Sequence, residues 1–229
     1  MRRKVIIWIA FLVIVMPLSA QKILFLGNSL TYTNNLPEIL EHIAEQYQIN
    51  INTESLCLPN YALIDHLDDG SFQKKIAKEK YDYVIVQQGP SSQQEGKTML
   101  LRDGATIKAL CSKYRAILGF FMVWPSKNYY FTFDKVIENH ELAAKSNKAL
   151  LFPVGSVWKE YNKEKNLESL YGSDRFHPSK AGIFLGALTI FHQLYPKKNL
   201  HQVNVSYYKK WIKDEDTFKA IIRFLEKQS

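Results

Sequence analysis

Five short apolar runs constrain the fold of this chain more than any other feature of its sequence. The runs are "KILFLG", "INTESLCL", "YDYVIVQQG", "AILGFFMVW" and "ALLFPVG", and three of them are nearly continuous in hydrophobic residues rather than alternating with polar ones. A strand that is apolar on both faces is typical of a parallel sheet that helices cover from both sides. We therefore expect these runs to form a central, buried sheet.

Stretches with the apolar spacing of helices lie between and after these runs. We expect helices at 36–47, 62–79, 98–114, 136–147, 180–195 and 214–227. The alternation of strands and helices predicts a three-layer α/β/α sandwich with a mainly parallel sheet. The chain has 229 residues, 46% of them hydrophobic, which is enough apolar material for one such domain.

The first twenty residues, 1–20, have the composition of a signal peptide rather than of the domain. "MRRK", "VIIWIAFLVIVMPL" and "SAQ" follow the basic, apolar and small-residue order of a secretory signal. The apolar stretch is shorter than the roughly 20 residues that span a bilayer, so we expect cleavage after Ala20, with a retained anchor as the alternative. The mature domain is then 21–229, exported to the periplasm or secreted, without a stable membrane span.

The charge and the cysteine content of the chain indicate which classes of partner and cofactor to expect. The formal net charge is +8 and falls to +5 without Arg2, Arg3 and Lys4, and the other lysines are scattered, which argues against a nucleic-acid partner. Cys57 and Cys111 stand in no zinc-binding spacing, although export leaves their pairing open. We expect neither a metal ion nor another cofactor. The oligomeric state has no signal in the sequence.

Small residues follow the first apolar run in "FLGNSLTY" and place Ser29 at the carboxyl end of an expected strand, where α/β sheets present their chemistry. A hydroxyl that attacks a carbonyl needs a base within hydrogen-bond reach and a third group that orients the base. "GSDRFHPSKAG" contains both, because Asp174 and His177 are three residues apart ahead of an expected helix. Pro178 keeps His177 out of that helix, and Ser179 is its expected N-cap.

Together, "FLGNSLT" and "DRFHPSKAG" resemble the first and last blocks of the SGNH, or GDSL-type, hydrolases, with the DxxHP pattern intact. The resemblance covers 22–195 and implies the flavodoxin-like SGNH fold. It also implies Ser29 as nucleophile, His177 as base and Asp174 as the acid that orients His177. Asn28 stands where the commonest form has Asp, a substitution that many members share. Taken alone, a Ser at this position is more often a turn or capping residue, so the interpretation depends on both blocks occurring together.

The groups that stabilise an oxyanion match the family less closely. The family uses the N–H of the nucleophile, a Gly N–H and an Asn side chain. The segment "LPNYALIDHL", where the Gly is expected, contains no Gly. Asn60 is the positional candidate for donating the backbone N–H there, and the alternative is that Asn60 is only a turn residue. In "QQGPSSQQE", Ser91 stands where the family has the Asn. The Gln-Gly pair at 88–89 is similar to one in carbohydrate esterases of this superfamily. We therefore expect Gln88, and after it Gln87, to donate, with purely structural strand-end residues as the alternative.

Three further side chains have less specific signals. Trp124 ends an expected strand, where it either lines a pocket or, as we favour, packs in the core. His66 and His140 lack a carboxylate at a telling spacing, because adjacent helical residues do not face each other. We expect both histidines at the surface.

The combined features predict an exported serine hydrolase that removes an acyl group, in the first instance O-acetyl, from a glycan or another small ester. Export, the Gln-Gly pair and an aromatic content of 13% favour a glycan ester. One alternative is an SGNH-fold module that binds a glycan or envelope component without turnover, which the missing Gly and Asn motivate. Another is an O-acyltransferase that uses the same three residues.

Overall fold

The structure is a computed structural model that describes residues 20–227, so nearly all of the expected signal peptide lies outside the described residues. Within this range, five parallel strands form one sheet in the order β2-β1-β3-β4-β5. This is the flavodoxin-like order, and it confirms the predicted fold class. The strands are β1 (Gln21–Gly27), β2 (Ile51–Cys57), β3 (Tyr83–Val86), β4 (Ile117–Phe121) and β5 (Leu150–Phe152).

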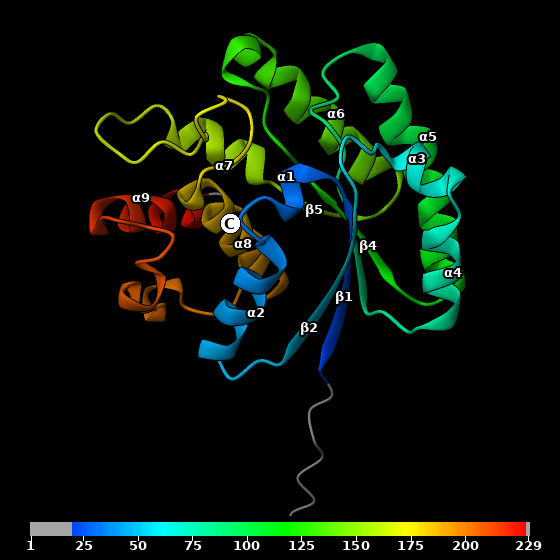
Figure 1. The fold of residues 1–229 in the computed structure, drawn as a ribbon, viewed down its shortest axis with the longest axis horizontal. Helices are drawn as coiled ribbons and strands as arrows, with labels where there is room; N and C mark the ends of the chain where they lie inside the picture. Colours follow the sequence, from blue (N-terminus) through cyan, green and yellow to red (C-terminus); the bar gives the residue numbers. More distant parts are fainter. Residues whose placement is uncertain (1–19, 228–229) are drawn as a thin grey trace, which may run out of the picture.

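Helices cover both faces of this sheet (Figure 1). One face carries α2 (Leu36–Gln46), α7 (Val154–Tyr161), α8 (Lys180–Leu194) and α9 (Glu215–Glu226). The other carries α3 (Leu63–Asp68), α4 (Ser71–Lys78), α5 (Gln94–Lys113) and α6 (Phe133–Ser146). Shorter helical segments are α1 (Ser29–Tyr32), η1 (Lys127–Thr132), η2 (Leu200–Gln202) and η3 (Val205–Tyr208).

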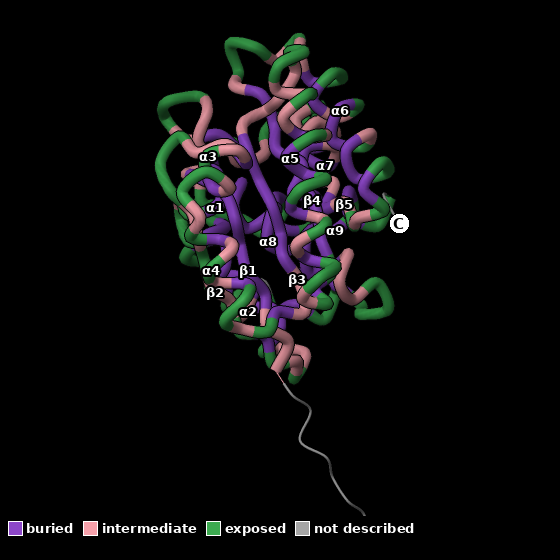
Figure 2. Tube along the Cα trace, turned by 90° about the vertical axis from the view of Figure 1, so that its right-hand side faces the viewer, coloured by how far each residue is buried: buried purple, intermediate pink, exposed green. Residues whose placement is uncertain are grey.

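The sheet separates two apolar cores, and β1 contributes to both. Ile23 and Phe25 belong to the core under α2 and α8, whereas Leu24 and Leu26 belong to the core under α3, α4 and α5. Successive side chains of a strand point to opposite faces, which explains this division. Figure 2 shows the resulting buried interior along β1 and α8. The continuous apolar runs of the sequence thus correspond to strands that are buried on both sides.

Three elements differ from the sequence-based expectation. The helix expected at 62–79 is two helices, α3 and α4, because Gly70 adopts a left-handed φ of 71° between them. Helix α5 begins earlier than expected, since its first turns are polar and lie outside the apolar periodicity. Helix α7 was not expected. Only one residue separates it from the end of β5, so the sequence has no break in its apolar residues that would separate the strand from the helix.

Helix α8 is deeply buried against one face of the sheet. Every residue of 181–192 is buried. A Cβ atom at Gly182 would lie 2.2 Å from the carbonyl oxygen of Leu170, so the glycine lets the preceding loop pack closely on the helix. Among the described residues, no helix combines the length and apolarity that crossing a bilayer requires.

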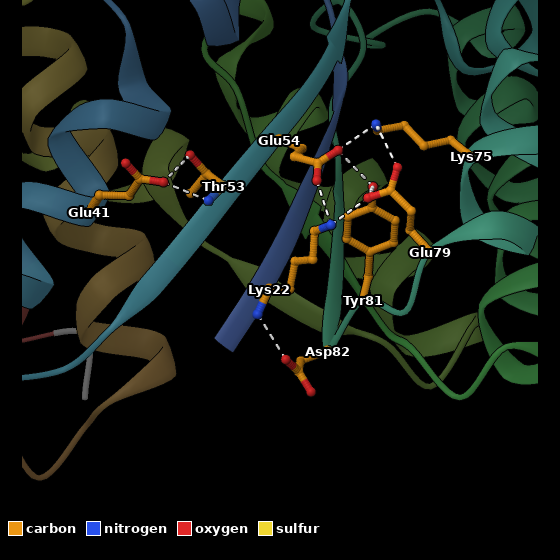
Figure 3. A network of polar contacts seen from close by, with 8 residues as sticks. All are labelled: Lys22, Glu41, Thr53, Glu54, Lys75, Glu79, Tyr81 and Asp82. Atoms are coloured by element: carbon orange, nitrogen blue, oxygen red, sulfur yellow. Dashed lines mark hydrogen bonds and ion pairs between the residues drawn. The ribbon is translucent and has the colours of Figure 1, made fainter. Parts of the chain in front are cut away.

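A network of charged side chains joins β1, β2 and α4 near the start of β1 (Figure 3). Lys22 pairs with Glu54 at 2.5 Å and with Glu79, and Lys75 pairs with the same two carboxylates. The Tyr81 hydroxyl donates to Glu54 at 2.9 Å. Partial burial opposes the ionisation of Glu54, but hydrogen bonds from Lys22 and Lys75 outweigh it and lower the pKa of Glu54 to about 2.

We expect Glu54→Gln to flatten the acid side of the stability profile. The pKa of Glu54 is lower in the folded chain than the ordinary value of 4.5, so its ion pairs stabilise the fold fully above that value. This contribution is lost as the pH falls from about 4.5 towards 2. Unfolding midpoints measured across this range should therefore fall less for the variant than for the wild type. Glu45→Gln, an exposed position of α2 outside the network, is the control, and equal acid slopes in all three proteins would contradict the prediction.

Candidate active site

Ser29 is the first residue of α1 and is separated by one residue from the end of β1, at the carboxyl end of the sheet. The preceding Asn28 caps α1, because its Oδ1 accepts the Leu30 N–H at 3.0 Å. Its Nδ2 donates to the carbonyl oxygen of Tyr61 at 2.9 Å, which ties the turn to the loop after β2. Leu30 is buried and anchors the short helix. These contacts fix the backbone on both sides of Ser29.

The buried side chain of Gln87 supports the turn around Ser29 through hydrogen bonds to Asn28 and Thr31. Its Oε1 accepts the Asn28 N–H at 3.0 Å and the Thr31 hydroxyl at 2.9 Å, and its Nε2 donates to Asn28 Oδ1 at 3.0 Å. The side chain is only 2% exposed. A Cβ atom at Gly27 would lie 2.6 Å from Gln87 Oε1, so the glycine allows this close approach. In this arrangement the Gln87 amide holds the turn that carries Ser29 and is not part of the cleft lining.

Ser29, His177 and Asp174 form one hydrogen-bonded chain. The ring Nε2 of His177 lies 2.8 Å from Ser29 Oγ, and the ring Nδ1 lies 2.5 Å from Asp174 Oδ2. A carboxylate only accepts hydrogen bonds, so Nδ1 carries the proton and Nε2 is free to accept the hydroxyl proton of Ser29. The structure therefore brings together the three residues that the two sequence blocks contribute, in the order that nucleophilic catalysis requires.

Asp174 is held ionised by the backbone of its own loop. Its Oδ1 accepts the N–H groups of Phe176 at 3.0 Å and of His177 at 2.9 Å. These bonds, the Phe176 N–H foremost and then the His177 side chain, keep the pKa of Asp174 below its ordinary value. The carboxylate is half exposed, so it orients His177 through geometry more than through burial.

The loop that carries His177 is fastened to the edge of the sheet by aromatic residues. Trp124 is fully buried, stacks on Trp158 with ring centroids 3.7 Å apart, and donates its indole N–H to the Phe176 carbonyl oxygen at 3.0 Å. The Tyr171 hydroxyl donates to the Pro125 carbonyl oxygen at 2.9 Å. Trp124 thus packs in the core, as we favoured, and it also positions the loop.

Gln88 points to the opposite side of β3 from Gln87. Its Oε1 accepts the Leu63 N–H at 3.3 Å, and its Nε2 donates to Ser91 Oγ at 2.7 Å and to the Gly96 carbonyl oxygen at 3.2 Å. The amide nitrogen therefore has one acceptor in the loop after β3 and one in the first turn of α5, and the donor role expected of Gln88 requires one of these bonds to break. Asn139 of α6, for which the sequence has no signal, donates to the Ser91 carbonyl oxygen at 2.9 Å.

Two backbone N–H groups remain as candidates for contact with an oxyanion. Asn60 lies in a turn after Pro59 with a left-handed φ of 60°, and its exposed side chain lines the cleft over Ser29. Within residues 20–227, neither the Asn60 N–H nor the Ser29 N–H has a hydrogen-bond acceptor. Both are therefore available to a ligand at the carboxyl edge of the sheet.

His66 and His140 are buried, so the expectation that they lie at the surface is wrong. His66 bonds through Nε2 to the Gly27 carbonyl oxygen at 2.9 Å, and burial lowers its pKa. His140 bonds through Nδ1 to the Val136 carbonyl oxygen at 2.8 Å, and burial lowers its pKa to about 4. His66 lies on the buried side of α3, and His140 lies on the buried side of α6. Packing against neighbouring elements determines their environment, whereas the residues adjacent to them in the sequence do not.

Neither cysteine is among the residues that line the cleft over Ser29. Cys57 and Cys111 are free, and burial raises the pKa of each thiol to about 12, so both remain protonated. Across residues 20–227, no group of three or more His, Cys, Asp or Glu side chains is placed to hold a metal ion.

We expect Gln87→Leu to destabilise the chain through the nucleophile turn. The substitution leaves the buried Asn28 N–H and Thr31 hydroxyl without their acceptor, which costs about 2 to 4 kcal/mol in the free energy of unfolding. Urea unfolding measures this loss, with Gln202→Leu on the exposed segment η2 as the control. A loss no larger than that of the control would show that Gln87 does not support the turn.

Comparison with known proteins identifies the fold. The chain matches no family model and no curated protein. It resembles the solved structure of a provisionally assigned SGNH hydrolase from Slackia heliotrinireducens, with 25% identity over 77% of this chain and 100% of that one and a TM-score of 0.65. A DUF4886 family protein from Bacteroides uniformis shares 16% identity over 91% of this chain and 94% of that one, with a TM-score of 0.74.

A variant of an acetyl-xylooligosaccharide esterase from a Geobacillus species shares 17% identity over 78% of this chain and 94% of that one, with a TM-score of 0.53. These similarities and the predicted sequence blocks agree on one fold, with the first block at the end of β1 and the last block before α8. The chain therefore has the SGNH-type hydrolase fold.

Proposed function

We propose that this chain is a carboxylic ester hydrolase that works by acyl transfer to Ser29. The observation that carries the proposal is the hydrogen-bonded chain from Ser29 through His177 to Asp174, with separations of 2.8 Å and 2.5 Å. It lies at the carboxyl edge of the sheet beside β1 and β3, where the strand order reverses. The SGNH-type fold and the esterases among its structural neighbours support the same reaction class.

The geometry defines a role for each group. His177 Nε2 takes the proton of Ser29 as Oγ attacks the ester carbonyl, and the same proton then goes to the leaving alcohol. Water next attacks the acyl-enzyme, again with His177 as base, and the carboxylic acid leaves. Asp174 stays ionised throughout and stabilises the imidazolium that forms twice in the cycle.

In this proposal the oxyanion is bound by backbone groups. The Ser29 N–H and the Asn60 N–H lack an acceptor within residues 20–227, and both residues line the cleft, whereas the amides of Gln87 and Gln88 hold the surrounding turns. Fixed donors of this kind typically contribute about 10²–10³-fold each to turnover. Gln88 becomes a third donor if substrate displaces one of its loop acceptors.

An O-acyl glycan, in the first instance an O-acetyl glycan, is the substrate class that we favour. The secretory composition of 1–20 supports a location in the cell envelope or outside the cell, where such esters occur in polymers. The similar fold of an acetyl-xylooligosaccharide esterase supports this class. Release of acetate from acetylated polysaccharides tests it directly.

Ser29→Ala should abolish ester hydrolysis and leave the fold intact. The nucleophile is lost, so kcat for 4-nitrophenyl acetate should fall by at least about 10⁴-fold, while the unfolding midpoint stays close to that of the wild type. Ser112→Ala, at an exposed serine of α5, is the matched control. Hydrolysis that survives in purified Ser29→Ala would overturn the assignment of the nucleophile.

The engaged amide of Gln88 favours a second candidate, a module that binds acetylated glycan without turnover. It differs from the hydrolase in two measurable ways. Wild-type protein would hydrolyse no ester, and its affinity for an acetylated glycan would be the same in Ser29→Ala. Turnover by the wild type excludes this candidate.

A further inference from the structure

The cleft above Ser29 is much larger than an acetyl group needs. Its volume is about 760 Å³, within the range of about 300–1,000 Å³ that holds a whole small ligand. Its walls come from the loops after β1, β2, β3 and β4 together with the loop that carries Asp174. The alcohol side of a substrate, and not only its acyl group, therefore has room in the cleft.

An exposed aromatic ring lies on one wall of this cleft. Tyr129 of η1 lines the cleft and is 63% exposed, and its ring centroid is 6.2 Å from that of the more exposed Phe131. Tyr61 and Phe176, both half-buried, also line the cleft. An aromatic face presented to solvent beside a reactive centre is suited to packing against the C–H face of a ligand ring.

The cleft is almost without charge, although the chain is basic. The sequence has 30 Lys and Arg against 22 Asp and Glu. Within residues 20–227, no Lys or Arg lines the cleft, and its single charged lining residue is Asp174, which the catalytic chain engages. An anionic substrate would therefore find no Lys or Arg side chain among the lining residues to pair with.

Neutral polar side chains supply the remaining contacts that a hydroxyl-rich ligand needs. Amides and hydroxyls can donate to and accept from sugar hydroxyls without favouring a charge. Besides the residues of the catalytic chain and of the turns around it, the amide and hydroxyl side chains that line the cleft include Asn60, Ser92, Gln93, Ser126, Asn128 and Thr132.

We propose that Tyr129 forms an aromatic subsite that stacks on an uncharged sugar ring of the substrate, so that the cleft selects esters of neutral glycans over anionic ones. This rests on the hydrolase function proposed above and specifies its substrate. The sugar ring packs on the Tyr129 face, its hydroxyls meet the neutral amides and hydroxyls, and its ester carbonyl reaches Ser29.

The test compares kcat/KM for O-acetylated xylotriose, O-acetylated trigalacturonate and 4-nitrophenyl acetate. The wild type should prefer the neutral trisaccharide to the anionic one by about 10-fold or more. The ratio of kcat/KM for acetylated xylotriose to that for 4-nitrophenyl acetate should fall about 10-fold in Tyr129→Ala and recover in Tyr129→Phe, which keeps the aromatic face. Tyr207→Ala is the matched control, because Tyr207 is 60% exposed and lies on η3, outside the cleft lining.

Several results would overturn this subsite. They are an unchanged ratio in Tyr129→Ala, an equal fall in Tyr207→Ala, or a preference for the anionic trisaccharide. A Tyr129→Ala loss that is as large for 4-nitrophenyl octanoate, again relative to the acetate, would assign the aromatic wall to acyl chains instead. If the wild type hydrolyses none of these esters, the hydrolase proposal fails, and calorimetric binding of xylotriose to wild type and Tyr129→Ala still decides whether Tyr129 binds sugar.

Discussion

The hydrogen bond between Ser29 Oγ and His177 Nε2 spans 148 positions of sequence, and the rest of the structure serves to hold its two ends together. On the serine side, β1 ends in a turn that Asn28 caps and Gln87 supports from within the protein. On the histidine side, buried Trp124 bonds the loop that presents the ring. Each end is fixed by groups that never need to touch a substrate, which is how a rigid scaffold keeps a reactive pair in register.

The side-chain amides of Gln87 and Gln88, the two residues that follow β3, have different structural roles. Gln87 and Gln88 point to opposite sides of the strand, so that one holds the nucleophile turn and the other holds the loop that forms a wall of the cleft. Both are buried, and a buried amide is stable only when its donors and acceptors are paired. Their pairing explains why the proposed oxyanion contacts fall to backbone N–H groups instead.

The sheet and its helical layers could be predicted from the sequence, because continuous apolar runs are local signals with a direct physical meaning. The resemblance of two sequence blocks to the SGNH hydrolases led us to expect that Ser29, His177 and Asp174 lie together, and the structure does bring them together. The roles of Gln87 and Gln88 could not be predicted from the sequence in the same way. The alternation of β3 does place Gln87 with Ile85 and Gln88 with Val86, but only the contacts show what each side holds. The burial of His66 and His140, and the exposure of Tyr129, depend on tertiary packing, which spacing along the chain does not reveal.

Active-site labelling tests the central claim, that His177 activates Ser29, most directly. The purified domain is incubated with a fluorophosphonate, and the modified peptide is identified by mass spectrometry. The account predicts one stoichiometric modification, on Ser29, that is lost in folded His177→Ala because the hydroxyl then has no base. Wild-type protein that remains unlabelled, or that is labelled on a different residue, would contradict it.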